Sequence, residues 1–454
     1  MMSRFARRRG LLPACILSAG ALVAMAAPGT AGASLGEQCS GPSVTGQGAS
    51  VEKIAQDSVW APAFNTSSDK LACNGKTGSK GEPVITYTST GSGAGLKSWG
   101  AELKEGEKAL FDVTNAFIGT SEAPNSSQIA EIEAQQTTST PKTLETIPVV
   151  QLAIAVIVNL PSGCTATSTA APGRLVLNNA TLEGIFQGTI STWSQITDDG
   201  DKLSGAGCNA ETPITRVVRQ DQAGTTHILK RYLDLVSNES FELEGGGTGT
   251  WNGISEGTLN TTWPKGPVAV VKPKSKGDAE EAAKVSTTPG SIGYGNLAEI
   301  RSTNLFSGSG GGPTTARFWV ELQHSSKKGK ATYSDPSTNG DAAEVGNANC
   351  KNTAYTNGVG SFPPPAITAP WNEVTTETTE KEYTLCGFTY VLAFTTYSAY
   401  PGTTQAEATT VNNYLRFVLD KKGGQKEITN HDYLALPKGT VDTEAVAGAA
   451  AIGF

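Results

Sequence analysis

Three deficits in the sequence narrow the functions that this chain can have. The 454 residues include only three histidines, and the seven cysteines lie far apart with no histidine beside any of them. This spacing argues against a metal site, which needs closely spaced cysteine and histidine ligands. Basic residues are also few, because 35 lysines and arginines against 42 acidic residues give a net charge of −7. Such an acidic chain is a poor partner for nucleic acid or for an anionic membrane.

Long apolar runs are scarce outside the N-terminal region. Four arginines lie within the first nine residues, residues 11–27 are mostly apolar, and Ala31-Gly32-Ala33 has the small-x-small pattern of a cleavage site. Residues 1–33 are therefore predicted to be a secretory signal peptide, using the general or the twin-arginine route, with a membrane anchor as the alternative. No lipid-attachment motif is clear. We expect an exported protein, periplasmic or extracellular, that is not lipid-anchored.

The cysteine count fits export. Cys15 would leave with the signal peptide, and the even number that remains predicts disulfides. Six cysteines allow fifteen pairings, but their order along the chain suggests three sequential ones, each worth about 3–4 kcal/mol in the chain-entropy model. These are Cys39–Cys73, Cys164–Cys208 and Cys350–Cys386.

Strand and helix patterns alternate along the chain. Residues 147–161, IPVVQLAIAVIVNLP, form a nearly continuous apolar and β-branched run, which is typical of a strand buried on both faces. A strand followed by a helix is predicted over 84–99, over 215–236 and again from 385 onward, where the last helix ends at Gly423-Gly424. This alternation predicts an α/β fold.

Three glycine-bearing corners share one design, in which a tight turn precedes a hydroxyl residue in the first turn of a predicted helix. They occupy residues 46–51, 89–97 and 219–227, and Ser50 is placed to cap the first helix. Many such corners only cap helices, but free N–H groups and the helix dipole also make them anion sites. Three corners together with Arg219 predict that a small tetrahedral oxyanion is bound.

The motifs GQGAS, STGSGAGLKSW, FIGTSEAP, VVRQDQAGTTH and TTPGSIGYGNL follow one another in this order. With them, most of residues 44–440 resembles the phosphate-binding proteins of Pst-type ABC transporters. The resemblance implies a two-lobed, type II-like periplasmic-binding-protein fold, with two crossover strands and a ligand cleft that closes like a hinge. Lobe I would contain residues 34–146 and 387–454. Lobe II would be 147–386, with insertions rich in Ser, Thr, Gly and Pro at 301–316 and 351–382.

The resemblance also implies a set of ligand-binding residues. Arg219 would donate paired N–H groups, hydroxyls and backbone amides would supply the other donors, and Asp221 would hold Arg219 from behind. The family usually has aspartate in place of Glu122 and serine in place of Ala223. These departures imply weaker binding or a somewhat different oxyanion. The implied ligand contacts are Ser50, Val51, Ser92, Glu122, Arg219, Ala223, Gly224 and Thr225.

Glu122 has a distinct expected role in this set. A carboxylate beside an anion is repulsive unless a proton lies between the two groups. Phosphate keeps a proton near neutral pH and sulfate has none, so an acceptor-only carboxylate favours phosphate.

The resemblance thus predicts an extracytoplasmic solute-binding protein that captures inorganic phosphate, or a close oxyanion, for an ABC-type importer. It would be a monomer without a cofactor, and a membrane permease would be its partner. One alternative is a surface or adhesive protein that has lost the ligand. Another is a secreted phosphate-ester hydrolase using His227 and Ser92, although residues 91–95 lack the G-x-S-x-G pattern.

Overall fold

The computed structural model describes most of the chain after the predicted signal peptide, and residues 1–33, with Cys15, lie outside the described part. No described helix combines the length and the apolarity that a membrane crossing requires. The described residues are 39–75, 82–138, 143–168, 174–196, 201–209, 211–266, 275–307, 316–327, 330–338, 346–351, 353–358, 363–364, 366–376 and 382–454.

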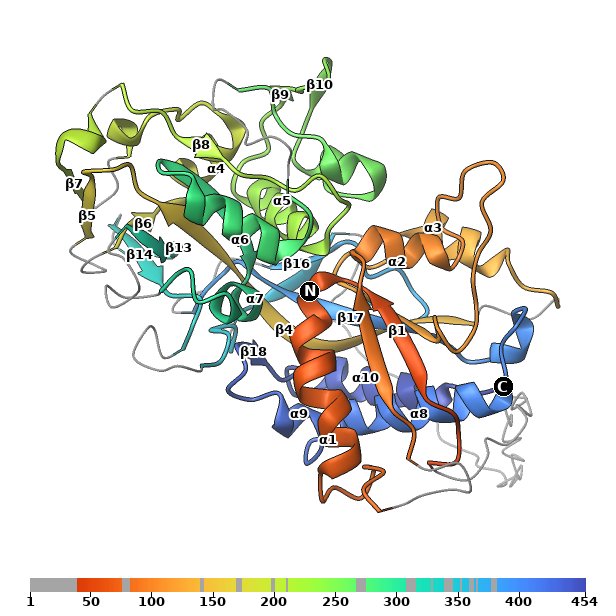
Figure 1. The fold of residues 1–454 in the computed structure, drawn as a ribbon. Helices are drawn as coiled ribbons and strands as arrows, with labels where there is room; N and C mark the ends of the chain where they lie inside the picture. Colours follow the sequence, from red (N-terminus) through yellow and green to blue (C-terminus); the bar gives the residue numbers. More distant parts are fainter. Residues whose placement is uncertain are drawn as a thin grey trace, which may run out of the picture. The chain divides into compact units, whose positions relative to one another are not determined.

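A mixed sheet of nine described strands organises the fold (Figure 1). Its main order is β2-β1-β3-β17-β4-β11-β8, and β12 and β18 also pair with β4. The mixture of this sheet with flanking helices confirms the predicted α/β class. The strands are β1 (Val44–Gly48), β2 (Ile85–Ser89), β3 (Phe117–Thr120), β4 (Leu144–Asn159), β8 (Thr215–Arg216), β11 (Ser291–Asn296), β12 (Arg317–Trp319), β17 (Cys386–Phe394) and β18 (Tyr433–Leu434).

Helices cover this sheet, and shorter strands pair among themselves. In Figure 1, α8 and α10 pack together against the sheet beside β4. The helices are α1 (Ala61–Thr66), α2 (Ser92–Ser98), α3 (Ser126–Glu133), α4 (Asn179–Gln187), α5 (Gly224–Val236), α6 (Gly277–Thr287), α7 (Leu297–Ser302), α8 (Gln405–Leu419), α9 (Gly424–Glu427) and α10 (Thr440–Ala451). The shorter strands are β5 (Thr165–Ser168), β6 (Val176–Leu177), β7 (Asp201–Ser204), β9 (Phe241–Glu242), β10 (Thr248–Gly249), β13 (Glu321–Lys327), β14 (Lys330–Ser334), β15 (Tyr355–Asn357) and β16 (Val374–Thr376).

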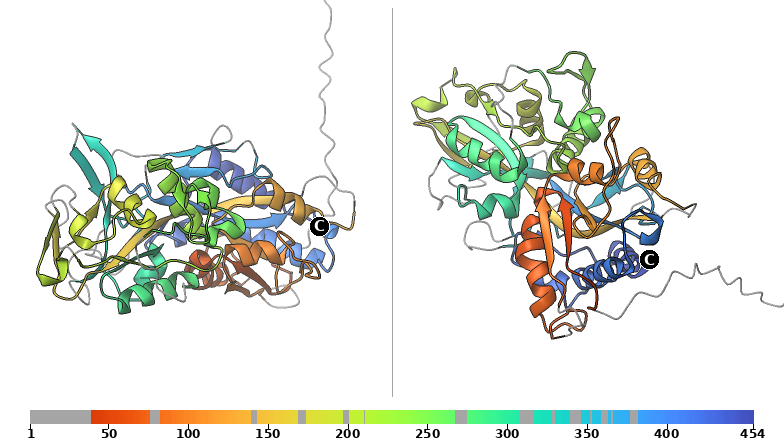
Figure 2. Two further views of the ribbon diagram at one scale, coloured as in Figure 1. Left: turned by 90° about the horizontal axis from the view of Figure 1, so that it is seen from above. Right: turned by 45° about the vertical axis from the view of Figure 1, so that its right-hand side comes forward.

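Strand β4 lies inside the sheet and pairs with four other described strands. All sixteen of its residues are buried, as the continuous apolar run predicts. It pairs antiparallel with β17 along most of its length and with β11 near its end. In Figures 1 and 2, β4 runs from the region of α5 and α6 to the region of α8 and α10. β4 and β17 thus lie where the two crossover strands were expected, while the lobe boundaries at 146/147 and 386/387 stay a prediction.

The strands that lead into the candidate site are parallel to their neighbours in the sheet. β1 runs parallel to both β2 and β3, and β8 runs parallel to β11. Because the carboxyl ends of parallel strands meet at the same edge of a sheet, the segments that follow β1, β2 and β3 emerge side by side. This edge is the usual place for a ligand in an open α/β sheet.

Two local predictions differ from the structure. The predicted single helix after the first corner is instead a 3-10 turn, η1 (Ser50–Glu52), a π-helical segment, η2 (Ile54–Trp60), and α1. Ser50 lies inside η1 and does not cap it, because Ala49 is the N-cap residue and no side chain caps this turn. The side-chain oxygen of the buried Gln56 accepts from the Tyr414 hydroxyl at 2.5 Å, a tertiary contact that periodicity does not reveal.

The last predicted helix also ends early. α8 stops at Leu419, and Gly424 begins the separate helix α9. The side chain of Asp420 accepts a hydrogen bond from the backbone N–H of Lys422 at 2.7 Å. This side-chain contact competes with helical hydrogen bonding and terminates α8 before the glycine pair is reached.

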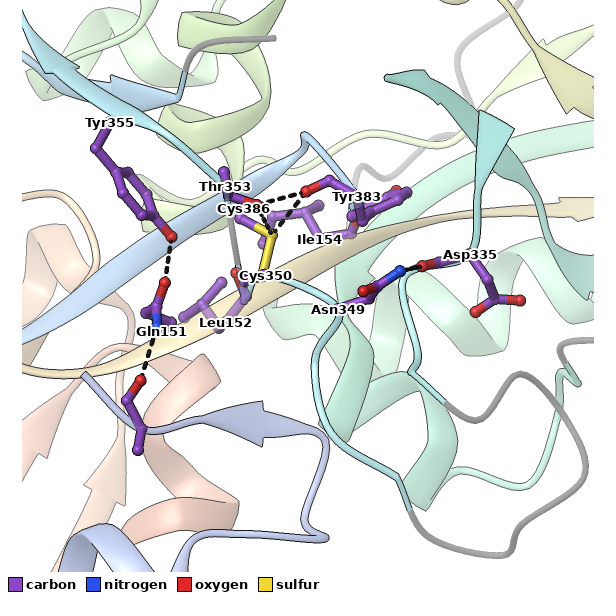
Figure 3. Close-up of a disulfide and its surroundings, with 11 residues drawn as sticks. Gln151, Leu152, Ile154, Asp335, Asn349, Cys350, Thr353, Tyr355, Tyr383 and Cys386 are labelled. Carbon is purple, nitrogen blue, oxygen red and sulfur yellow. Dashed lines mark hydrogen bonds between the residues drawn. A yellow bond between two sulfur atoms is a disulfide. The ribbon is translucent and has the colours of Figure 1, made fainter. Parts of the chain in front are cut away.

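The three sequential disulfides are present, namely Cys39–Cys73, Cys164–Cys208 and Cys350–Cys386. Cys386 begins β17 and pairs in register with Ala153 of β4, so the third disulfide lies on the central strand pair (Figure 3). Nearby, the Tyr355 hydroxyl contacts Oε1 of Gln151 at 2.9 Å. The described part of the insertion predicted at 351–382 is therefore fastened to β4 and contributes a buried Trp371 to the core.

Removal of the third disulfide should cost more stability than removal of the second. Both close loops of similar size, so the chain-entropy model gives about 4 kcal/mol for each. Cys350 and Cys386 are buried, whereas Cys208 is only partly buried. We expect C350A/C386A to lower the free energy of unfolding in urea further than C164A/C208A does. Equal losses for the two double variants would contradict a packing contribution at β17.

Candidate functional site

The first three segments converge at the carboxyl ends of β1, β2 and β3. The N–H of Gly91 donates to the carbonyl oxygen of Gly48 at 2.7 Å, and the N–H of Ala49 donates to Gly119 at 2.8 Å. Gly91 adopts φ 94°, a conformation that favours glycine, immediately before α2. The Ser92 hydroxyl, at the start of that helix, accepts from the N–H of Ser121 at 3.3 Å.

The fourth segment, residues 219–225, packs against the other three. The N–H of Gly93 donates to the carbonyl oxygen of Gln222 at 3.3 Å. Gly224 lies so close to the turn after β3 that a Cβ atom added to it would be 2.1 Å from the Ser121 hydroxyl. Only glycine fits there. All four predicted segments therefore meet at one place.

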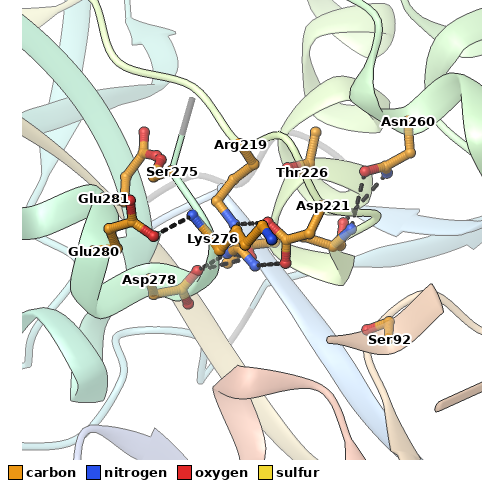
Figure 4. A network of polar contacts seen from close by, with 12 residues as sticks. Ser92, Arg219, Asp221, Thr226, Asn260, Ser275, Lys276, Asp278, Glu280 and Glu281 are labelled. Atoms are coloured by element: carbon orange, nitrogen blue, oxygen red, sulfur yellow. Dashed lines mark hydrogen bonds and ion pairs between the residues drawn. The ribbon is translucent and has the colours of Figure 1, made fainter. Parts of the chain in front are cut away.

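Arg219 lies at the centre of this meeting point and is completely buried (Figure 4). Its Nε donates to Oδ1 of Asp221 at 2.8 Å and its Nη2 to the other carboxylate oxygen, so the expected contact with Asp221 is present. Its Nη1 donates to Oδ1 of Asp278. Burial lowers the pKa of Arg219, but the two carboxylates outweigh that effect and raise it above its ordinary value. The guanidinium is charged at every relevant pH.

Asp278 is the principal site residue that sequence reasoning missed. It lies in the first turn of α6, is completely buried, and accepts from the Thr225 hydroxyl at 3.0 Å through Oδ1. Its Oδ2 accepts from the backbone N–H of Asn296 at 3.0 Å. Burial raises the pKa of Asp278 although Arg219 opposes the shift. An acidic residue in the first turn of a helix is common, so the sequence gives no sign of this role.

Glu122 is buried beside the same loop. Its Oε1 accepts from the Gln222 side chain at 2.9 Å and from the backbone N–H of Gly257 at 2.7 Å. Its Oε2 is buried and has no hydrogen-bond partner among the described residues. Burial raises the pKa of Glu122 to about 8. Near pH 7 this carboxyl is therefore mostly protonated, and it can donate a hydrogen bond as well as accept one.

Asn260, which the sequence analysis also missed, holds the loop at Ala223. Its side-chain oxygen accepts from the Ala223 N–H at 3.0 Å, and its side-chain nitrogen donates to the Ala223 carbonyl at 3.2 Å. The residue occurs in a polar segment without an apolar pattern, so no signal in the sequence marks it. Its two hydrogen bonds fix the backbone immediately before α5.

A cleft of about 400 Å³ opens beside these residues. Of the predicted residues, Ser50 and Asp221 line it, while Ser92, Glu122, Arg219 and Thr225 are buried and do not line it. Val51 and Ala223 are buried too, and both backbone polar groups of Ala223 already bond to Asn260. The cleft is lined by Ser50, Lys53, Ser89, Thr90, Gly91, Asp221, Lys276, Gly277, Asp278, Ala279 and Glu299.

His227 is packed away from the predicted oxyanion site. Its Nδ1 lies 3.3 Å from the carbonyl oxygen of Ser255, and burial lowers the pKa of His227 to about 4. A G-x-S-x-G pattern that the sequence analysis missed includes this serine, at residues 253–257. Ser255 follows the 3-10 turn η5 (Asn252–Ile254), and its buried hydroxyl donates to Asn252 at 2.9 Å. This is not the strand-to-helix turn that presents a nucleophilic serine.

The chain belongs to the PBP superfamily, because the family model for a PBP superfamily domain matches residues 43–422. This confirms the resemblance on which the two-lobed fold was predicted. Across the part of the chain that the structure describes, no group of three or more potential metal ligands occurs.

Several proteins that are similar to this chain are named as phosphate-binding proteins. Phosphate-binding protein PstS 3 of Mycobacterium tuberculosis is 28% identical over 251 residues, which is 53% of each chain. The match therefore spans about half the length of this curated relative. Two solved structures share the fold over about 90% of both chains, at 16% identity. They are a high-affinity periplasmic phosphate-binding protein (PfluDING), with a TM-score of 0.52, and a human phosphate-binding apolipoprotein, with a TM-score of 0.55.

The raised pKa of Glu122 predicts a specific change in stability with pH. The folded state holds a proton on Glu122 up to about pH 8, whereas an unfolded glutamate loses it near pH 4.3. The stabilisation is thus fully present below pH 4.3 and is lost as the pH rises through 8, by up to about 1.4 kcal/mol per pH unit.

We expect E122Q to lose less stability than the wild-type chain between pH 5 and pH 8, as measured by urea unfolding. The exposed Glu105 offers a matched control, and E105Q should follow the wild-type profile. If the E122Q and wild-type profiles are parallel across this range, Glu122 does not hold a proton in the folded state.

Proposed function

We propose that this chain is an extracytoplasmic substrate-binding protein that captures inorganic phosphate, or a close oxyanion, for an ABC-type importer. The observation that carries the proposal is the meeting of the segments that contain Ser92, Arg219 and Thr225. Arg219 donates to the Thr225 hydroxyl at 3.2 Å, and the N–H of Gly93, beside Ser92, donates to the carbonyl oxygen of Gln222 at 3.3 Å. Membership of the PBP superfamily and the phosphate-binding relatives support it. The permease, the monomeric state, and export by means of residues 1–33 belong to the same proposal.

Short-range hydrogen bonds would give this acidic protein its affinity for an anion. Long-range repulsion from the net negative charge is screened beyond about 10 Å at moderate salt. At contact, charge-assisted hydrogen bonds from a guanidinium, hydroxyls and backbone amides determine affinity. Arg219 is fixed by Asp221 before a ligand arrives, so little ordering is needed on binding.

In this proposal Glu122 shares a proton with the ligand. A protonated Oε2 donates to a fully ionised oxyanion, and an ionised Oε2 accepts from an oxyanion that carries a proton. The Oε2 atom supports this role because it is buried and has no hydrogen-bond partner among the described residues. A ligand that bonds to it would offset the free-energy cost of its desolvation. Phosphate offers both protonation states near neutral pH, whereas sulfate offers only one.

Movement of two lobes about β4 and β17 would admit the ligand. The strands are paired along nine residue pairs, so they form one continuous hinge. The hydrogen bonds from Gln222 and Gly257 to Glu122 join the predicted lobe II to the predicted lobe I. Opening the cleft would break these contacts, and closing it would bury the ligand.

Removal of Arg219 should abolish phosphate binding. We expect R219A to bind phosphate at least about 100-fold more weakly than the wild-type chain by calorimetry, which corresponds to about 2.7 kcal/mol. The acceptor-only role expected of Glu122 requires its ionised form, so a large excess of sulfate should fail to displace phosphate above about pH 8 and should compete better below that pH.

R174A is the matched control for this experiment. Arg174 is also buried and paired with two carboxylates, Glu321 and Asp335, but it lies outside the proposed site. Its loss should reduce stability and leave phosphate affinity unchanged. Equal affinities for phosphate in R219A, R174A and the wild type would refute the proposal.

We also propose that the chain binds its ligand without chemical turnover, because the neutral, buried His227 contacts a backbone carbonyl. We expect no hydrolysis of a chromogenic phosphate ester beyond the buffer rate, and H227A should behave as the wild type does. Hydrolysis that disappears in H227A or S255A, but not in R174A, would instead identify a hydrolase.

A further inference from the structure

Two donors of the proposed oxyanion site already bond to a carboxylate of the same chain. Nη1 of Arg219, which lies beside Asp278 in Figure 4, donates to Oδ1 of Asp278. The hydroxyl of Thr225 donates to the same oxygen. The remaining Arg219 contacts to a carboxylate go to Asp221, on the side of Nε and Nη2. The Asp278 oxygen thus receives the hydrogen bonds that the proposed function requires an oxyanion oxygen to receive.

A carboxylate is a good substitute for an oxyanion at this position. Both are acceptor-only groups whose oxygens carry negative charge, and both form short, charge-assisted bonds to a guanidinium. Asp278 is held in place by a third donor, the N–H of Asn296 at the start of α7. Asp278 is also one of the residues around the cleft, next to Gly277 and Ala279, although its side chain is completely buried behind the cleft wall.

We propose that Asp278 competes with the oxyanion for Arg219 and Thr225, so that anion binding requires this carboxylate to take up a proton or to turn away. The inference rests on the proposed function and assigns Asp278 as a specificity-determining residue of that site. It predicts that the anion binds more tightly as the pH falls, because protonation weakens the competitor.

The surroundings of Asp278 favour proton uptake. It is completely buried, burial raises its pKa, and Asp221 raises it further against the effect of Arg219. An arriving anion would add a second negative charge within contact distance, and a like charge disfavours ionisation. The ionisable groups that face Asp278 or line the cleft beside it are Arg219, Asp221, Glu281, Tyr294, Glu299, Lys53, Lys276 and Tyr433.

The isosteric variant D278N separates competition from simple positioning. If Asp278 only positions Arg219, then loss of its charge should weaken phosphate binding. If it competes, D278N should bind phosphate more tightly, by about tenfold at pH 8.5 for each unit by which binding raises the pKa of Asp278. The ratio of the two affinities should become smaller as the pH is lowered to 5.5. Ionisation of phosphate and of Glu122 affects both proteins, so the ratio of their affinities isolates Asp278.

E145Q is the matched control. Glu145 is another buried acid with a raised pKa, but it lies on β4 opposite Ala393 and no described contact joins it to the proposed site. Its phosphate affinity should match that of the wild type within about threefold at both pH values. Thermal unfolding of all three proteins verifies that they are folded.

A proton count provides a second, independent test. Calorimetric titration of phosphate into the wild type, in two buffers with different ionisation enthalpies, gives the protons taken up on binding. We expect the wild type to take up more protons at pH 7.5 than D278N does.

The outcomes separate this inference from the proposed function. Tighter binding by D278N at pH 8.5, with a smaller affinity ratio at pH 5.5, supports the inference. If the wild type shows no phosphate binding while D278N binds phosphate, the inference about Asp278 is supported. The proposed function of the natural chain is then wrong. An affinity ratio of one or below at both pH values, with equal proton uptake, overturns the inference alone. Absence of binding in both proteins overturns both.

Discussion

The charge on the buried Arg219 is the constraint on which the site depends. A guanidinium without access to water must be paired, because the cost of burying an isolated charge is several kcal/mol or more. Asp221 accepts two hydrogen bonds from Arg219 and Asp278 accepts a third, while the Thr225 hydroxyl accepts from Arg219 and donates to Asp278. The loop before α5 is therefore rigid, and the donors of the site are aligned before any ligand is present.

Strand β4 holds the segments of the site in fixed positions relative to one another. It pairs with β17 on one side and with β11 on the other. The segments that follow β1 and β3 are therefore fixed relative to the loop that follows β8. Gly91 and Gly224 then permit backbones from the two parts to touch. A Cβ atom at Gly224 would push the loop before α5 away from the turn after β3. The close packing of these two backbone segments therefore explains the glycine as well as anion binding does.

Much of this arrangement could be predicted from the sequence because it depends on local patterns. The apolar run gives β4, the order of the cysteines gives the three disulfides, and the glycine corners give the four segments that converge. Asp278, Asn260 and the winding of η1 and η2 could not be predicted, since each depends on contacts between residues far apart in the chain. The pKa values of Glu122 and His227 follow from burial, which periodicity does not report for a polar residue in a turn. The G-x-S-x-G pattern at 253–257 is a local motif that does not predict its usual structure. It lacks the strand and the helix on either side that give such a serine its catalytic geometry.

Charge balance links these observations. If Asp221 and Asp278 are both ionised, they carry two negative charges against the single positive charge of Arg219, and Glu122 lies at the same meeting point. A site with excess buried negative charge resists an anion unless protons compensate. Glu122 and Asp278 are both buried carboxyls with raised pKa values, and both lie within the site. In the proposed site a proton would therefore enter with the oxyanion, and the ligand best suited to such a site would be one that can itself carry the proton.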